Sequence, residues 1–150
     1  MKIRGISRET LLFILESARK KHPKEFAGLM EADRTGLIVN VHVLPGTTED
    51  EASAHIPTHM MPLGVRVAGS VHSHPTEEFE PSDEDLHLFS QQGDRHIIAG
   101  WPYREDTWGC YDAGGSPVGL AVLDETPGPL EPLWEEELKS LKAKTGRRKR

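Results

Sequence analysis

The sequence contains one cysteine, Cys110, in 150 residues. A single cysteine excludes an internal disulfide framework and a cysteine-rich zinc module. It suits a reducing compartment, and we expect Cys110 to be a buried strand residue rather than a nucleophile. The chain also has no apolar run near the ~20 residues that a membrane-spanning helix needs, and its N-terminus has no signal-peptide h-region. These absences predict a cytoplasmic protein with no membrane partner.

Negatively charged residues are absent from the last nine positions, where residues 142–150 hold six cations and no acid. The whole chain carries a net charge of −6, which disfavours nucleic acid as a partner of its surface. Its length and its 36% hydrophobic content suit one domain that can bury a core. We expect residues 1–125 to form this domain, and residues 126–150 to be a Pro/Gly linker, a short charged helix and a basic tail.

Hydrophobic periodicity predicts an α+β or three-layer α/β/α domain built on a mixed sheet. Ser7 is expected to cap a helix that runs to about Lys21. Ser82 is expected to cap a second helix that runs to about Gln92, with Gly93 at its C-terminus. Strands are expected at 26–30, 37–44, 65–71, 96–101, 107–111 and 118–123. Residues 45–59 are expected to form a loop, with a short strand near 52–56.

Groups that can bind a metal are concentrated between His72 and Asp85. His72 and His74 are two residues apart at the end of a predicted strand, so their side chains point to the same face, with about 6–7 Å between Cα atoms. Ser82-x-x-Asp85 is a helix-start pattern that places Asp85 in the first turn, where the connecting loop can fold it back towards the histidines. Two imidazoles and one carboxylate are the protein ligands of a catalytic zinc that keeps its fourth position for water.

Each half of this pattern also has a structural explanation. A histidine pair can decorate a surface strand in a chain with eight histidines, and a capping box stabilises a helix by about 1 kcal/mol. We favour the metal site because both halves occur together, and because of the family resemblance described below. The remaining histidines are expected to be solvated or packed rather than ligands: His22, His42, His55, His59, His87 and His96.

Peptide hydrolysis at zinc also needs a proton carrier. The H-E-x-x-H signature, which supplies a carboxylate locally, is absent, so a glutamate from elsewhere is required. Glu25 stands at the start of an apolar strand, where a carboxylate can be partly desolvated and still face a cleft. A solvated residue at a helix-to-strand turn is an equal alternative for Glu25. The other upstream candidates are Glu9 and Glu16 on the exposed side of the first helix, Glu31, and Glu49 and Glu51 in a loop.

The spacing His72-x-His74, seven residues, then Ser82-x-x-Asp85 resembles the JAMM (MPN-plus) metalloprotease family, especially its short archaeal and bacterial members. The segment from His22 to Leu29, HPKEFAGL, matches the place where this family carries its catalytic glutamate. The likeness extends from the first helix to about residue 124. It implies a single MPN/JAB domain with a strongly curved mixed β-sheet flanked by helices, similar in layout to cytidine deaminase.

The resemblance also implies roles for individual residues. His72, His74 and Asp85 would hold one zinc ion per chain, with water as the fourth ligand. Glu25 would act as general base and acid, and Ser82 would stabilise the oxyanion. The implied reaction is hydrolysis of the isopeptide or peptide bond after the C-terminal Gly-Gly of a ubiquitin-like modifier, with conjugates of such a modifier as substrates. Desampylase-like activity and the processing of sulfur-carrier proteins both stay open.

Some features depart from the family pattern or fit other classes. Val71 stands where many eukaryotic members have an aromatic residue, which disfavours the eukaryotic deubiquitinase branch. Glu78 lies four residues after His74, as in a cupin, but no later glycine-and-histidine cupin motif follows. A catalytically silent MPN scaffold is disfavoured because the histidines and the acid are all present. Monomer and homodimer stay open.

Overall fold

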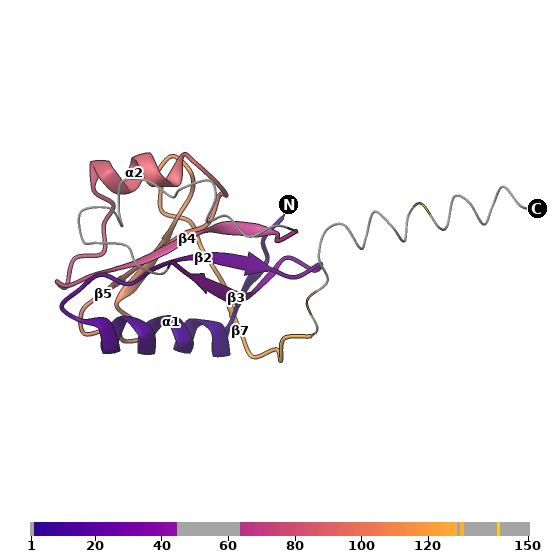
Figure 1. The fold of residues 1–150 in the computed structure, drawn as a ribbon, viewed down its shortest axis with the longest axis horizontal. Coiled ribbons are helices and arrows are strands. Elements are labelled where there is room, and N and C mark those ends of the chain that lie inside the picture. The colour runs from indigo at the N-terminus through magenta and orange to yellow at the C-terminus, as the bar shows by residue number, and fades with distance from the viewer. Residues whose placement is uncertain (1, 45–63, 129, 131–140, 142–150) are drawn as a thin grey trace, which may run out of the picture.

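A computed structural model describes residues 2–44, 64–128, 130 and 141, and these residues form one seven-stranded sheet with two helices. The strand order is β6-β5-β4-β2-β3-β1-β7. Helix α1 covers one face of the sheet and α2 lies over the other (Figure 1). The elements are β1 (Gly5–Ser7), α1 (Arg8–Lys21), β2 (Ala27–Ala32), β3 (Leu37–Val43), β4 (Val67–His74), α2 (Asp83–Phe89), β5 (His96–Gly100), β6 (Trp108–Tyr111) and β7 (Val122–Leu123).

The sheet is mixed, as predicted. Strand β4 pairs antiparallel with β2 and parallel with β5, and β2 pairs antiparallel with β3 in the expected hairpin. Because side chains alternate along β4, its odd and even positions meet different helices. Val71 belongs to the core cluster that includes the apolar face of α1, whereas the ring of His72 lies near Phe89 of α2. The expectation of a sheet flanked by helices is therefore confirmed.

Helix α1 follows its sequence prediction closely. The Ser7 hydroxyl accepts a hydrogen bond from the Thr10 backbone N–H at 3.1 Å, which confirms Ser7 as the N-cap. The helix ends at Lys21, one residue before His22, with three basic residues in its last turn. Four of its apolar residues are buried at the spacing of one helix face, namely Leu11, Ile14, Leu15 and Ala18. Leu12 and Phe13 lie outside this face and are exposed.

Helix α2 is shorter than predicted. It begins after Ser82 with the expected capping box, but it ends at Phe89 rather than near Gln92. The predicted role of Gly93 as a C-cap residue is wrong. Gly93 lies in the turn back to the sheet with a φ of +81°, and a Cβ there would lie 2.4 Å from the Ala68 carbonyl oxygen. The helix stops early because the chain must return to begin β5 beside β4.

The last strand is also shorter than predicted, and one strand was missed. Val118 donates to the Cys110 carbonyl at one edge of the sheet, whereas Ile6 donates to the Ala121 carbonyl at the other edge. The segment from Val118 to Ala121 therefore crosses between edges, and only β7 remains as strand. Strand β1 lies in parallel between β3 and β7, and at three residues it is too short to show alternation.

Several expectations lie outside the described residues, namely the loop at 45–59 with its short strand, and the helix and basic tail after residue 130. No helix in the described part of the chain is long and apolar enough to cross a membrane. Cys110 is buried in β6, as expected. Burial raises the pKa of its thiol to about 11, so it is not an activated nucleophile.

His96 is packed rather than solvated. Its ring stacks on Phe89 with 4.3 Å between centroids. Its Nδ1 accepts a hydrogen bond from the Ser70 backbone N–H at 3.0 Å, so Nε2 carries the proton and faces the Gly93 carbonyl at 3.3 Å. Burial lowers the pKa of this imidazole to about 4, and the folded protein therefore holds His96 in its neutral form.

This burial predicts a loss of stability in mild acid. An unfolded histidine binds its proton near pH 6.5 and the folded one only near pH 4, so stability falls as the pH drops between these values. Between pH 7 and pH 5 the His96 contribution to the unfolding free energy should fall by about 2 kcal/mol. Urea unfolding of wild type and His96→Asn, which keeps an acceptor for Ser70, measures this. Equal pH dependence in the two proteins would contradict the burial of a neutral imidazole.

Candidate metal centre

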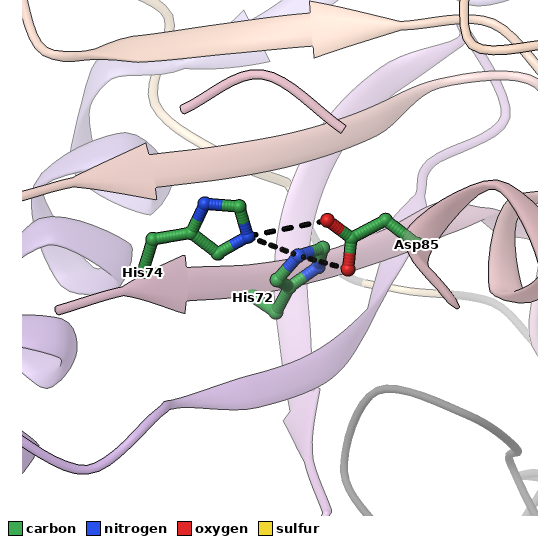
Figure 2. Close-up of side chains that lie close together, drawn as sticks. All are labelled: His72, His74 and Asp85. Atoms are coloured by element: carbon green, nitrogen blue, oxygen red, sulfur yellow. Dashed lines mark hydrogen bonds and ion pairs between the residues drawn. The ribbon is translucent and has the colours of Figure 1, made fainter. Parts of the chain in front are cut away.

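Three side chains with metal-binding atoms converge between the end of β4 and the start of α2. Figure 2 shows the His72 and His74 rings, both from β4, turned toward the carboxylate of Asp85, which comes from α2. The two Nε2 atoms are 3.2 Å apart. One Asp85 oxygen lies 2.9 Å from Nε2 of His72, and the other lies 3.2 Å from Nε2 of His74. The structure therefore brings together the three residues that the sequence predicted as ligands.

Backbone contacts orient two of the three groups. Nδ1 of His74 donates to the Glu78 carbonyl at 3.0 Å, which leaves the Nε2 lone pair free for a metal. Ser82 donates its backbone N–H to Asp85 Oδ2 at 2.9 Å, within the capping box of α2. Nδ1 of His72, in contrast, is buried and has no hydrogen-bond partner among the described residues. Packing near the Phe89 ring, 6.3 Å away between centroids, holds this imidazole instead.

The electrostatics of the group suit a cationic ligand. Burial alone would raise the pKa of Asp85, but hydrogen bonds with His72 and His74 hold this pKa well below its usual range. Burial lowers the pKa of His74, but the neighbouring Asp85 carboxylate raises it by more than burial lowers it. The pKa of His74 is therefore above its ordinary value. Asp85 is therefore an anion at neutral pH. A metal cation bound by these groups would neutralise this carboxylate.

The donor set and its spacing fit zinc. A tetrahedral zinc ion with bonds of about 2.0–2.1 Å holds its ligand atoms about 3.3 Å apart, close to the separations observed between these nitrogens and oxygens. The candidate group in the described residues consists of His72, His74 and Asp85. Three protein ligands leave a fourth position, as in catalytic zinc sites. The Glu78 side chain is exposed and only its carbonyl contacts His74, so the geometry does not support a cupin-type set.

Glu25 lies beside this group but outside it. The register of β2 and β4 pairs Ala27 with His72. Extended two residues outward along both strands, this antiparallel register would bring Glu25 opposite His74. Two hydrogen bonds between Phe26 and Ser73 continue the pairing to this point, at 2.8 and 2.9 Å. The Glu25 carboxylate also raises the pKa of His74, so the two side chains share one environment. Glu25 is half-buried.

The other predicted glutamates and histidines lie elsewhere. Glu9 and Glu16 are exposed on α1, as expected. Glu31 is buried and binds His42 at 2.8 Å, a contact that the sequence did not suggest. His87 is exposed. Glu49, Glu51, His55 and His59 lie outside the described residues.

Sequence reasoning missed two residues that support the site. Ser73, between the two histidines, is fully buried and its hydroxyl accepts a hydrogen bond from the Phe26 backbone N–H. Because side chains alternate along a strand, the position of Ser73 between the two histidines indicated that its side chain faces away from them. Its hydrogen bond with Phe26 was not predictable from the sequence. Tyr103 donates a hydrogen bond to the His74 carbonyl at 3.0 Å, and it comes from a turn far along the chain.

Comparisons with known proteins agree with this geometry. Residues 7–111 match the family described as prokaryotic homologs of the JAB domain. A protein of Haloferax volcanii named probable metalloprotease is 39% identical over an alignment of length 129 that covers 80% of each chain. A JAB1/MPN domain protein from Archaeoglobus fulgidus is 38% identical, with a TM-score of 0.65 over 79% of this chain and 98% of that one. A structure described as JAMM, a metalloprotease-like zinc site in the proteasome and signalosome, is 35% identical, with a TM-score of 0.64 over 81% of this chain and 99% of that one.

Removal of one ligand should remove the metal. His74→Ala leaves two ligands and an uncompensated carboxylate at Asp85, so we expect zinc content to fall from one ion per chain to near zero after dialysis. Elemental analysis of the purified protein measures this. His87→Ala is the matched control, because His87 is exposed two residues from Asp85 and should not affect zinc. Full zinc occupancy in His74→Ala would disprove the ligand assignment.

Proposed function

Because the chain belongs to the family of prokaryotic homologs of the JAB domain, we propose that it hydrolyses the bond after the C-terminal Gly-Gly of a ubiquitin-like modifier. The chain is a zinc metallopeptidase of the JAMM type. The observation that carries the proposal is the β2–β4 register, which pairs Ala27 with His72 and leads the segment of Glu25 toward His74, beside a group of two histidines and one aspartate. This combination supplies both a metal site and a separate proton carrier.

His72, His74 and Asp85 would hold the zinc ion through two imidazole nitrogens and one carboxylate. Zinc in such a site acts as a Lewis acid that lowers the pKa of a water to about 7 and polarises a carbonyl. The buried side chains of His72 and Asp85, each 2% exposed, fix two of the ligands. The His74 side chain is 16% exposed, so the group opens to solvent at His74.

Glu25 is the proton carrier in this proposal. Its carboxylate takes a proton from the attacking water and delivers it to the nitrogen of the leaving amine. A half-buried position beside His74 supports this role, because a carboxylate there can reach solvent and still face the reacting bond. The two hydrogen bonds between Phe26 and Ser73 hold the backbone next to Glu25, which would limit the reorganisation needed for each transfer.

Ser82 is the donor to the developing oxyanion. Its hydroxyl oxygen accepts the Asp85 backbone N–H at 3.2 Å as the N-cap of α2. The hydroxyl proton is therefore available to a substrate carbonyl, and the side chain is exposed. A donor that the helix cap already orients would stabilise negative charge on the carbonyl oxygen in the transition state.

Two features support a Gly-Gly junction attached to a lysine-bearing target. Glycine has no side chain, so its carbonyl can come close to a site whose ligands are mostly buried. The loop and helix start that follow His74 present exposed acids, which would attract a basic target protein. These acids are Glu77, Glu78, Glu80, Asp83 and Glu84.

The proton-carrier role predicts separate effects on metal and rate. Glu25→Gln should keep one zinc ion per chain and lose at least about a hundredfold in kcat, because the amide cannot carry the proton. The assay is cleavage of a lysine conjugate joined through Gly-Gly, with and without a zinc chelator. A conjugate joined through Ala-Ala is the matched substrate control and should resist cleavage. Turnover by Glu25→Gln at the wild-type rate would assign the proton transfer to another residue.

The oxyanion role of Ser82 can be separated from its role as a helix cap. Glycine at an N-cap lowers helix stability by only a few tenths of a kcal/mol, whereas alanine lowers it by about 1 kcal/mol. We expect Ser82→Gly and Ser82→Ala to lose similar factors of about a hundredfold in kcat, while only Ser82→Ala is clearly less stable. Steady-state kinetics and thermal unfolding measure the two quantities. Wild-type kcat in Ser82→Gly would leave Ser82 with a capping role alone.

A further inference from the structure

Tyr103 is a buried tyrosine in a backbone conformation that bulky residues rarely adopt. It lies in the turn between β5 and β6, it is 1% exposed, and its φ is 64°. Such a conformation persists only where the surroundings fix it, and it is more frequent at functional sites. Tyr103 donates its backbone N–H to the Gly100 carbonyl at 2.9 Å, and its own carbonyl accepts from the Arg19 guanidinium at 2.7 Å. Helix α1 therefore helps to hold this turn.

The Tyr103 hydroxyl joins two segments that are far apart in the sequence. It donates to the His74 carbonyl at 3.0 Å and lies 2.8 Å from Nδ1 of His22. A phenol has one proton, and the His74 carbonyl can only accept. Nδ1 of His22 must therefore donate to the Tyr103 oxygen, which gives a directed chain from His22 through Tyr103 to His74. The His22 and Tyr103 rings also meet edge to face, with 5.6 Å between centroids.

This hydrogen-bond chain attaches one end of the segment that carries Glu25. His22 is the C-cap of α1, and Glu25 follows three residues later. Phe26, at the other end, is bound to Ser73 through the two hydrogen bonds that continue the sheet. The segment from His22 to Phe26 is therefore fixed at both ends to the last residues of β4. Glu25 lies between these two attachments in the sequence.

We propose that Tyr103 and His22 are positioning residues for the reaction, because their hydrogen-bond chain to the His74 carbonyl sets the distance between the Glu25 carboxylate and the metal ligands. This inference rests on the proposed role of Glu25 as proton carrier. Tyr103 does not touch the ligating atoms, since its contact is with the backbone of His74. It acts on the base and not on the metal. Loss of its hydroxyl should slow proton transfer while substrate binding and zinc occupancy stay unchanged.

Tyr103→Phe tests the proposal by removing the hydroxyl and keeping the ring. We expect one zinc ion per chain, a KM within about twofold of wild type and a kcat at least about tenfold lower, since a shift of about 1 Å in a catalytic group can lower rates about a hundredfold. Loss of zinc, or a change in KM with wild-type kcat, would overturn the proposal. Ser7→Ala is the control for general destabilisation, because it removes the cap at the far end of α1 and should leave kcat unchanged.

Variants of His22 test the direction of the hydrogen-bond chain. His22→Asn places an amide N–H near the position of Nδ1, so it should keep kcat within about threefold of wild type. His22→Ala removes the donor and should match Tyr103→Phe, and the double variant should be no slower than either single one. Equal losses in His22→Asn and His22→Ala, or multiplied losses in the double variant, would overturn the proposal.

The Glu25→Gln background separates this proposal from the one on which it rests. If Tyr103 acts through Glu25, Tyr103→Phe should not lower the residual rate of Glu25→Gln any further. A further tenfold loss there would show that Tyr103 acts on another group. If Glu25→Gln is inactive and Tyr103→Phe turns over at the wild-type rate, the positioning role fails and the function of Glu25 stands. If Glu25→Gln is fully active, the role of Glu25 fails first.

Discussion

The carboxylate of Asp85 accepts a hydrogen bond from the Ser82 backbone and faces two imidazoles at the same time, and the site depends on this double contact. The capping box fixes the first turn of α2, and with it the direction of the carboxylate. The imidazoles come from β4, whose alternation sets both rings on one face. A buried anion between them would be unfavourable without a cation. The fold thus holds a carboxylate in place that needs a positive partner, which a metal ion supplies.

A second constraint is the register between β2 and β4, which relates the proposed base to the ligands. Because Ala27 pairs with His72, the backbone register alone directs the segment of Glu25 toward His74. On one side of Glu25, Ser73 binds Phe26 and extends the pairing of β2 with β4. On the other side, His22 is linked to the His74 carbonyl through the Tyr103 hydroxyl. The backbone of the sheet therefore sets the geometry between acid-base group and metal ligands. This explains how the proposed proton carrier can lie forty-seven residues before the first proposed ligand in the sequence.

The parts of the fold that local chemistry determines were predictable. The Ser7 cap and the apolar face of the residues after it predicted α1. The spacing of His72, His74 and Asp85 predicted the candidate ligand group. The ends of α2 and β7 were not predictable, because the chain there turns or crosses the sheet to meet distant partners such as Ala68 and Cys110. Tyr103 was missed for the same reason, since its partners His22 and His74 are remote in sequence. The roles of Glu25 and Ser82 stay predictions, supported by placement.

We propose that two imidazoles and the capped carboxylate hold one zinc ion. X-ray absorption at the zinc edge, on protein purified without added metal, tests this ligand set. We expect about one zinc per chain with nitrogen and oxygen neighbours at about 2.0–2.1 Å, including two imidazoles and no sulfur. A sulfur neighbour, a single imidazole, or stoichiometric iron in place of zinc would contradict it.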